Sequence, residues 1–287
     1  MNRFYRLKIR AFFYYLDQYV RLLGNPGTKR RFAVVYGYAK LRVLEKLQPK
    51  RQQPVKLLGW QVSHGSLFFL RHLYREIFIE RLYARHQPGE ASLIIDAGAN
   101  IGIATLWYRY QYPDARIICF EPDPSTFKLL EANVTGNGLE NVELHNVAVS
   151  DVAGELEFYF DENLSGGDVA HSVNREFRAA LDDRPAVASR KVPAVPLAGY
   201  LAPPPDILKV DIEGSEVAAL GSSLGQLKHV PLLQMEYHYL ANNTLSQLLD
   251  ILEQAGHTYR VYLDGPLENK LGRVAMIYST NQENLRE

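Results

Sequence analysis

From residue 89 onward, short apolar runs alternate with segments whose apolar residues recur at helical spacing. The apolar runs predict strands at 92–97, 115–121, 142–149, 207–212 and 231–237. The segments between them predict helices at 101–112, 124–135, 216–227 and 245–255. Apolar runs without polar alternation are typical of strands buried on both faces, and their alternation with helices is typical of a parallel sheet covered on both sides.

The last two apolar runs of the chain, 258–263 and 274–278, have a turn sequence, Asp264-Gly265-Pro266, and no helix between them. Two strands that are joined without a helix pair in the antiparallel direction. The pattern therefore predicts an α/β domain over residues 89–287. Its sheet is mostly parallel and seven-stranded, ends in an antiparallel hairpin and carries helices on both faces.

The first 88 residues have a different pattern. They predict helices with breaks at 24–27 and 49–54, followed by a periodic segment at 66–86. We expect a helical cap or extension over residues 1–88, through which two copies of the chain can also associate.

The segment 1–24 opens with basic residues and then turns aromatic. Asp17 and Arg21 interrupt its apolar run, which is too short and too polar for a spanning helix. We therefore expect no transmembrane segment. An amphipathic helix here either covers the core or lies on a membrane surface or a second subunit.

A stretch at 158–191 breaks the alternation of strands and helices. It is too long for a tight connection between two elements. Two interpretations stay open, a loop that contacts the substrate and a surface insertion without a chemical role.

Composition narrows the class of protein. Hydrophobic residues make up 47% of the chain, enough for a substantial core. Lysine plus arginine equals aspartate plus glutamate at 32 each, so no overall field gathers nucleic acid or an anionic membrane, although local basic patches are not excluded. Cys119 is the single cysteine and lies in an apolar run. We expect a buried, inert thiol and a reducing, cytoplasmic location.

The clearest motif is LIIDAGANIG at 93–102. An acid, Asp96, ends an apolar strand, and Gly98, Asn100 and Gly102 follow in the turn before a helix. Glycines let the backbone approach a ligand closely, and the helix that follows offers unpaired N–H groups. A dinucleotide site has GxGxxG instead. The pattern favours a cofactor without a pyrophosphate, S-adenosylmethionine, with Asp96 near its cationic amino-acid end.

A second acid ends the next predicted strand in the sequence CFEPDP. Glu121 lies 25 positions after Asp96, about the separation expected for an acid that accepts both ribose hydroxyls. Either acid alone fits a role as a helix cap. Two acids at adjacent strand ends together indicate a nucleoside site.

The sequence KVDIEGSE places three charged side chains at alternate positions, Lys209, Asp211 and Glu213, at the carboxyl end of a strand. Alternate positions share a face, and ligands of open parallel sheets bind at this edge. Our hypothesis is that Asp211 or Glu213 accepts or orients a substrate hydroxyl while Lys209 adjusts the charge. The competing hypothesis is a buried structural pair of Lys209 and Asp211, with Glu213 as a helix cap.

The next strand ends in MEYHY, with Glu236 and His238 on one face. A histidine titrates near neutrality and suits a general base, although a buried structural histidine is the alternative. Glu213, Glu236 and His238 can also bind a divalent metal. No spacing in the sequence requires one, so no metal is assigned.

Five motifs in this order, IIDAGANIG, FEPDP, NVAVSD, ILKVDIEGSE and MEYH, resemble the FkbM-type methyltransferases. The resemblance spans residues 93–238 and implies a class I methyltransferase with a Rossmann-like fold. It implies an O-methyltransferase acting on hydroxyls of sugars, polyketides or other natural products. It also implies roles in cofactor binding. The amino-acid half would lie on Asp96, Gly98, Asn100 and Gly102, the ribose on Glu121 and the adenine against Val147 and Ala148.

Other functions fit the sequence less well. Methylation of amino groups on bases or amides typically needs an Asn/Asp-Pro-Pro-aromatic motif, which KVDIEG lacks, and the neutral charge disfavours nucleic acid. An NAD(P)-binding Rossmann oxidoreductase is disfavoured by the glycine spacing. A catalytically inactive partner protein is disfavoured by the presence of both Asp96 and Glu121. The expectation is a cytoplasmic O-methyltransferase of a glycan or small natural product.

Overall fold

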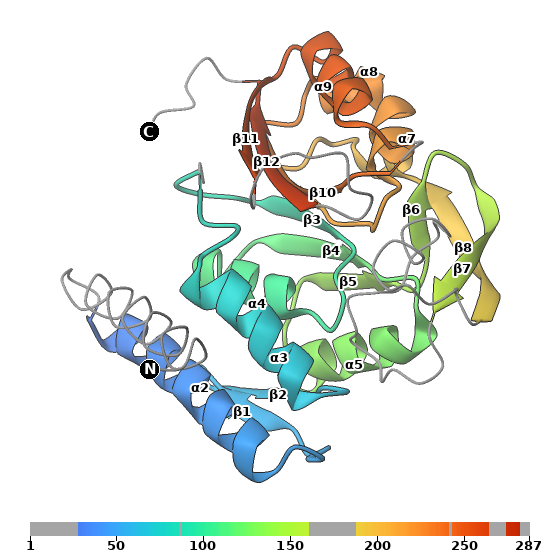
Figure 1. Ribbon diagram of the computed structural model, residues 1–287. Helices are drawn as coiled ribbons and strands as arrows, with labels where there is room; N and C mark the ends of the chain where they lie inside the picture. The colour runs from blue at the N-terminus through green and yellow to red at the C-terminus, as the bar shows by residue number, and fades with distance from the viewer. Residues whose placement is uncertain (1–27, 86–87, 161–187, 241–242, 264–273, 282–287) are drawn as a thin grey trace, which may run out of the picture.

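The computed structural model describes residues 28–85, 88–160, 188–240, 243–263 and 274–281. Its main sheet has the strand order β11–β12–β10–β9–β3–β4–β5 (Figure 1). The strands are β3 (Leu93–Ala97), β4 (Arg116–Phe120), β5 (Val142–His145), β9 (Ile207–Val210), β10 (Leu232–His238), β11 (Thr258–Leu263) and β12 (Val274–Thr280). Only β12 runs antiparallel to its neighbours within this sheet. The predicted class I methyltransferase fold, with its reversed final strand, is confirmed.

Alternate strand residues face opposite sides of the sheet and pack under two groups of helices. Ile94, Ile117 and Ile207 contact one apolar cluster, under α4 (Ile103–Gln111) and α5 (Pro124–Thr135). Ile95, Ile118 and Leu208 contact the other, under α7 (Glu216–Gly221), α8 (Leu224–Leu227) and α9 (Leu245–Gln254). Figure 1 shows these two layers on either side of the sheet. Burial on both faces explains why the strands read as continuous apolar runs.

The described part of the N-terminal region packs on the α4 and α5 side. It contains α2 (Thr28–Leu47), α3 (Leu67–Tyr74) and a π-helical turn η1 (Arg75–Ile79). It also contains a hairpin of β1 (Val55–Leu57) and β2 (Trp60–Val62), which the sequence pattern did not predict. The side-chain oxygen of Asn133 on α5 accepts from the N–H of Ser63, just after β2, and that of Asn137, just after α5, accepts from the N–H of Gln61. These elements share one apolar cluster with the sheet, and the boundary at residue 88 stays a prediction.

No described helix is long and apolar enough to cross a membrane. The segment 1–24, for which we expect an amphipathic helix, lies outside the described residues.

Two predicted elements are divided in the structure. The strand predicted at 142–149 is wrong, because β5 ends at His145 and β6 (Ala148–Ser150) joins a second sheet with β7 (Gly154–Phe160) and β8 (Ala188–Pro196). Between β5 and β6, the side chain of Asn146 donates to the carbonyls of Glu121 and Pro122. The helix predicted at 216–227 breaks into α7 and α8, where the Ser223 hydroxyl donates to the carbonyl of Ala219.

Part of the predicted insertion at 158–191 is regular structure. The ends of β7 and β8 fall within it and pair in the antiparallel direction, with Phe158 buried between them. Residues 161–187 lie outside the described residues, so the choice between a substrate loop and a surface insertion stays open.

A row of polar side chains crosses the α4 side of the sheet. Cys119, Asp96, Lys209 and Gln234 occupy adjacent positions in register on β4, β3, β9 and β10. At one end of the row, Gln234 donates to the carbonyls of Tyr83 and Arg85 and accepts from the hydroxyl of Tyr108 at 2.8 Å. At the other end, Cys119 is fully buried as expected, and burial raises the pKa of its thiol.

The Tyr108 hydrogen bond gives a test of this core. Tyr108→Phe leaves the buried Gln234 oxygen without its donor, so we expect the free energy of unfolding to fall by about 1–3 kcal/mol. Denaturation by urea measures this change. Tyr36→Phe, at a position that is 62% exposed, is the matched control and should change stability by less than about 0.5 kcal/mol. Equal stability of the two variants would contradict the role of Tyr108.

Candidate functional site

The glycine loop at 98–102 links β3 to α4 and requires glycine at two positions. Gly98 has a φ of 79°, and a Cβ there would lie 1.7 Å from the Asp211 carbonyl oxygen. Gly102 has a φ of 86°, and a Cβ there would lie 2.7 Å from Leu130. The loop therefore packs directly against the chain that leaves β9, and it brings the backbone of 98–102 to the carboxyl edge of the sheet.

Asn100 connects this loop to Glu121. It has a φ of 51°, a left-handed conformation that asparagine tolerates better than most residues. Its side-chain oxygen accepts from the N–H of Ile101 at 2.7 Å, and its own N–H donates to a Glu121 carboxylate oxygen at 3.0 Å. The loop and the acid of the next strand are thus one assembly, as their expected roles at one ligand require.

Glu121 lies at the end of β4 and is 7% exposed. One carboxylate oxygen accepts from Asn100 and the other accepts from the N–H of Asp123 at 2.9 Å. Burial raises the pKa of Glu121 to about 8, although both N–H groups oppose this shift. Each oxygen keeps a lone pair for a further donor, so this carboxyl group can accept two hydroxyls.

Asp96 is fully buried and compensated within the protein. It lies 3.0 Å from the Lys209 ammonium and accepts from the Thr105 hydroxyl at 2.7 Å. Its expected contact with the cationic end of a cofactor stays a prediction, because the described contacts of its carboxylate are to Lys209 and Thr105.

Lys209 is also buried, and its ammonium donates to the Gly98 carbonyl at 2.5 Å. It lies 3.6 Å from Asp211, farther than from Asp96. Burial alone would lower the pKa of Lys209, but Asp96 and Asp211 outweigh it and raise the pKa above its usual value. Lys209 therefore carries a charge that ties the glycine loop to β3 and β9.

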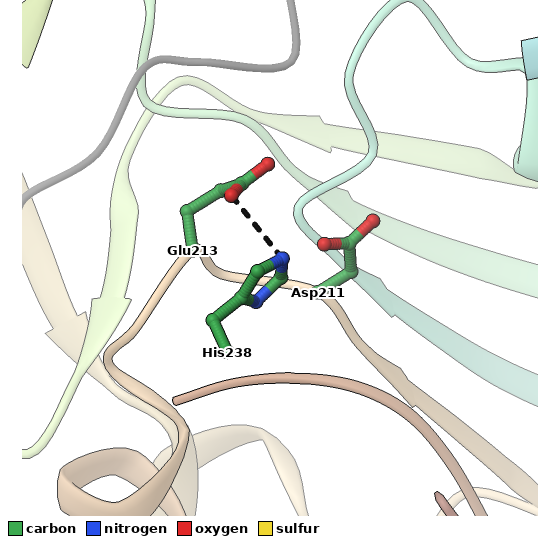
Figure 2. A group of neighbouring side chains, drawn as sticks. All are labelled: Asp211, Glu213 and His238. Carbon is green, nitrogen blue, oxygen red and sulfur yellow. Dashed lines mark ion pairs between the residues drawn. The ribbon is translucent and has the colours of Figure 1, made fainter. Parts of the chain in front are cut away.

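Asp211, Glu213 and His238 converge at the ends of β9 and β10 (Figure 2). The expected strand-like alternation stops after Asp211, because Glu213 has a φ of 53° and Gly214 a φ of 96°. This turn directs Glu213 to His238 Nε2, at 3.3 Å. Glu236 lies 3.9 Å from the same nitrogen, as expected for two residues on one face of a strand.

Glu216 is a site residue that sequence reasoning missed. Its carboxylate is fully buried, and one oxygen lies 2.9 Å from His238 Nδ1. The N–H of Gly214 donates to this oxygen, and the Asn243 amide donates to the other at 2.6 Å. No local sequence pattern predicts the contact between Glu216 and His238, because tertiary packing brings together two residues that are 22 positions apart.

The carboxylates at this edge shift one another's protonation. Burial raises the pKa of Asp211 and Glu213, and burial together with Asp211 raises the pKa of Glu236 to about 8. Burial would lower the pKa of His238, but Glu213 and Glu216 outweigh it and raise the pKa well above its usual value. Groups with such shifted pKa values at a ligand edge are candidates for proton transfer and cation binding.

The two residues expected at an adenine lie where the main sheet meets the second one. Ala148 is buried in β6, paired with Ala194 of β8, and Val147 is half-buried against the α7–α9 side. Nearby, His145 stacks on Phe120 with ring centroids 5.0 Å apart. The role of Val147 and Ala148 at the adenine stays a prediction.

Comparisons with known proteins show what the chain is similar to. Residues 96–260 match the methyltransferase FkbM domain. A protein described as methyltransferase 1 of Beauveria bassiana is 27% identical over 161 residues, which are 52% of this chain and 65% of that relative. The 31-O-demethyl-FK506 methyltransferase FkbM of Streptomyces tacrolimicus is 36% identical over 115 residues, 38% of this chain and 43% of that one. The chain thus spans less than two thirds of the length of either relative.

The crystal structure of a methyltransferase FkbM from Methylobacillus flagellatus aligns with a TM-score of 0.45 and 16% identity, over 74% of this chain and 53% of that one. The family match covers more than half of the chain and includes the glycine loop, Glu121 and the edge at Asp211, Glu213 and His238. The chain therefore belongs to the FkbM methyltransferase domain family.

Proposed function

We propose that this protein is an S-adenosylmethionine-dependent O-methyltransferase whose acceptor is a hydroxyl of a sugar, glycan or small natural product. One observation supports this most strongly. The glycine loop with Glu121 and the cluster at Asp211, Glu213 and His238 lie at the carboxyl ends of adjacent parallel strands. Ligands of open α/β sheets bind at this edge. A nucleoside-binding acid there would hold the ribose of the cofactor, and a proton-transfer group would face the acceptor hydroxyl.

The cofactor end fits an adenosine without a pyrophosphate. Glu121 has acceptor capacity for two ribose hydroxyls, and the half-buried Gly98 and Asn100 of the adjoining loop lie at the same carboxyl edge of the sheet. The loop lacks the glycine spacing of dinucleotide sites. These features support S-adenosylmethionine over a nicotinamide cofactor.

S-adenosylmethionine, when bound, supplies a methyl group on a positively charged sulfur. At the end of the site away from Glu121, Asp211 and Glu213 would orient the acceptor hydroxyl toward this methyl group and stabilise the loss of the hydroxyl proton. The ammonium of Lys209 would hold the Gly98 carbonyl and the Asp211 carboxylate in place. His238 Nε2 lies 3.3 Å from Glu213, and it would orient that carboxylate.

The acceptor class is supported by the relatives. The Streptomyces relative is named for methylation of an oxygen of an FK506 precursor. KVDIEG at the equivalent strand end lacks the proline pair typical of amino methylation. Both features favour a hydroxyl acceptor.

Titration calorimetry with S-adenosylhomocysteine tests the cofactor assignment. We expect micromolar binding to the protein and at least about tenfold weaker binding to Glu121→Gln, because the charged acceptor of the ribose hydroxyls is lost. Glu157→Gln, on the exposed side of β7, is a matched control and should bind as the wild type does. Binding of NAD in place of the thioether would overturn the proposal.

The pH dependence of the same titration identifies the carboxyl group. With a pKa of about 8, Glu121 is mostly protonated at neutral pH and must ionise to accept two hydroxyls. Affinity should therefore increase from pH 6 to pH 8, by at most about tenfold per unit, and level off above. Glu121→Gln should remove this component. An identical pH profile in the variant would contradict the assignment.

A further inference from the structure

Asp211, Glu213 and His238 each offer one ligand atom, and these three atoms lie within 4.8 Å of one another. Figure 2 shows the two carboxylates and the imidazole approaching a common region from the ends of two neighbouring strands. A donor set of oxygen and imidazole nitrogen suits a divalent cation such as Mn²⁺.

An independent contact behind the histidine supports a metal ligand. His238 Nδ1 lies 2.9 Å from the buried Glu216 carboxylate and Nε2 faces Glu213, so the neutral imidazole that binds a metal would keep its proton on Nδ1. Asn243 and the Gly214 N–H fix Glu216 in turn. A carboxylate that holds the far nitrogen of an imidazole is the usual outer partner of a histidine that binds metal.

The charges at this edge also favour a cation. Five carboxyl groups gather here, from Asp96, Asp211, Glu213, Glu216 and Glu236, together with the ammonium of Lys209 and the imidazole of His238. Carboxylates this close together disfavour one another's ionisation, and a bound cation would reduce that repulsion. The side chains of Asp211 and Glu213 are 24% and 20% exposed, which leaves a path for an ion.

We propose that Asp211, Glu213 and His238 bind a divalent cation of the Mn²⁺ or Mg²⁺ type, with Glu216 positioning His238. The catalytic role of this cation site rests on the proposed methyltransferase function. The cation would hold the acceptor oxygen and stabilise its negative charge after its proton passes to a solvent water. The oxygen then forms a bond to the methyl carbon as the carbon–sulfur bond breaks, which leaves a neutral thioether.

Binding of Mn²⁺ to the full chain, followed by electron paramagnetic resonance without nucleotide or acceptor, tests the site. We expect one ion per chain and at least about tenfold weaker binding to Asp211→Asn and Glu213→Gln. Glu216→Gln should weaken binding by about 10- to 100-fold, the usual effect of losing an outer partner. Glu157→Gln is again the control. Mn²⁺ should also raise the melting temperature of the wild type and the control but not of Glu213→Gln.

Absence of Mn²⁺ binding at millimolar concentration would overturn the metal site. So would binding of Mn²⁺ to Asp211→Asn and Glu213→Gln that is as tight as its binding to the wild type. Titration of the same samples with S-adenosylhomocysteine separates the two proposals. Thioether binding without Mn²⁺ binding refutes the metal site and leaves the methyltransferase proposal standing. Mn²⁺ binding without thioether binding supports the metal site and contradicts the methyltransferase proposal.

A separate observation concerns the outer side of α2. Phe32, Tyr36, Val43 and Leu47 are between 55% and 71% exposed. At about 100° per residue they lie within roughly 60° of the helix circumference, and so form one apolar stripe. The opposite side of α2, with Val34, Tyr38 and Leu41, is buried in the core. A helix that is apolar on two sides has a second surface to cover.

Basic residues concentrate in the same part of the chain. Residues 1–56 contain 14 lysines and arginines against 2 acidic residues, while residues 57–287 contain 18 against 30. The neutral total therefore combines a strongly basic segment with an acidic remainder. On α2 itself, Arg42 and Lys46 are exposed beside the apolar stripe. An apolar and aromatic stripe flanked by cations is typical of a helix that lies in a membrane interface.

We infer that this face of α2 docks onto an anionic lipid surface. Charge complementarity selects this occupant, because a second copy of the chain would bring another basic segment against the first. Residues 1–27 of the chain carry five basic residues against one acidic residue and are disfavoured for the same reason. The apolar stripe adds nothing to the binding of nucleic-acid phosphates.

Co-sedimentation of the full chain with lipid vesicles tests this surface. We expect at least about tenfold more binding to vesicles with about one third phosphatidylglycerol than to phosphatidylcholine alone, and loss of that difference at high salt. Phe32→Ser with Leu47→Ser should bind at least tenfold less, whereas Val152→Ser, at another exposed apolar residue, should bind as the wild type does. Unchanged melting temperatures verify that the variants fold.

Three results would overturn the lipid surface. They are equal binding to both vesicle types, unchanged binding of the double variant, and a dimer that forms without lipid and is lost in the double variant. The last result would assign the stripe to a second copy of the chain.

Discussion

The buried ammonium of Lys209 is the interaction on which the arrangement of the site depends. It pairs with Asp96 on β3, and it donates to the carbonyl of Gly98 in the loop that follows. A buried charge is tolerated only when partners surround it, so this contact fixes three segments at once. It also changes the meaning of the first acid of the motif. Asp96 acts on the site by holding Lys209, and through it the glycine loop, whatever further contact it makes with a ligand.

The site has two chemically different ends, on either side of the contacts that Lys209 makes. At one end, the buried carboxylate of Glu121 accepts from two backbone N–H groups and keeps acceptor capacity. At the other, the carboxylates of Asp211, Glu213 and Glu236 crowd around His238, whose far side is fixed by Glu216. The first environment suits neutral hydroxyl donors, and the second suits a cation or a hydroxyl that loses its proton.

The sequence predicts what is set by local chemistry and burial. The bounds of α5 were predicted because Asp123 caps the helix and Pro124 begins it, and the central strands were predicted because both of their faces are buried. The hairpin β1–β2 was missed, because its two strands are only three residues each. Glu216 was missed because its partner His238 is reached through tertiary packing. Glu213 left the expected face because its backbone turns into a left-handed conformation, which no alternation rule anticipates.

The central claim is that the glycine loop with Glu121 holds an adenosine cofactor whose reactive end faces Asp211 and Glu213. A crystal structure of the protein with S-adenosylhomocysteine tests it most directly. The account predicts both ribose hydroxyls within about 2.6–3.2 Å of the Glu121 carboxylate, and the sulfur beside the 98–102 loop on the side of Asp211. A thioether bound away from Glu121, or with its sulfur turned away from Asp211, would contradict the account.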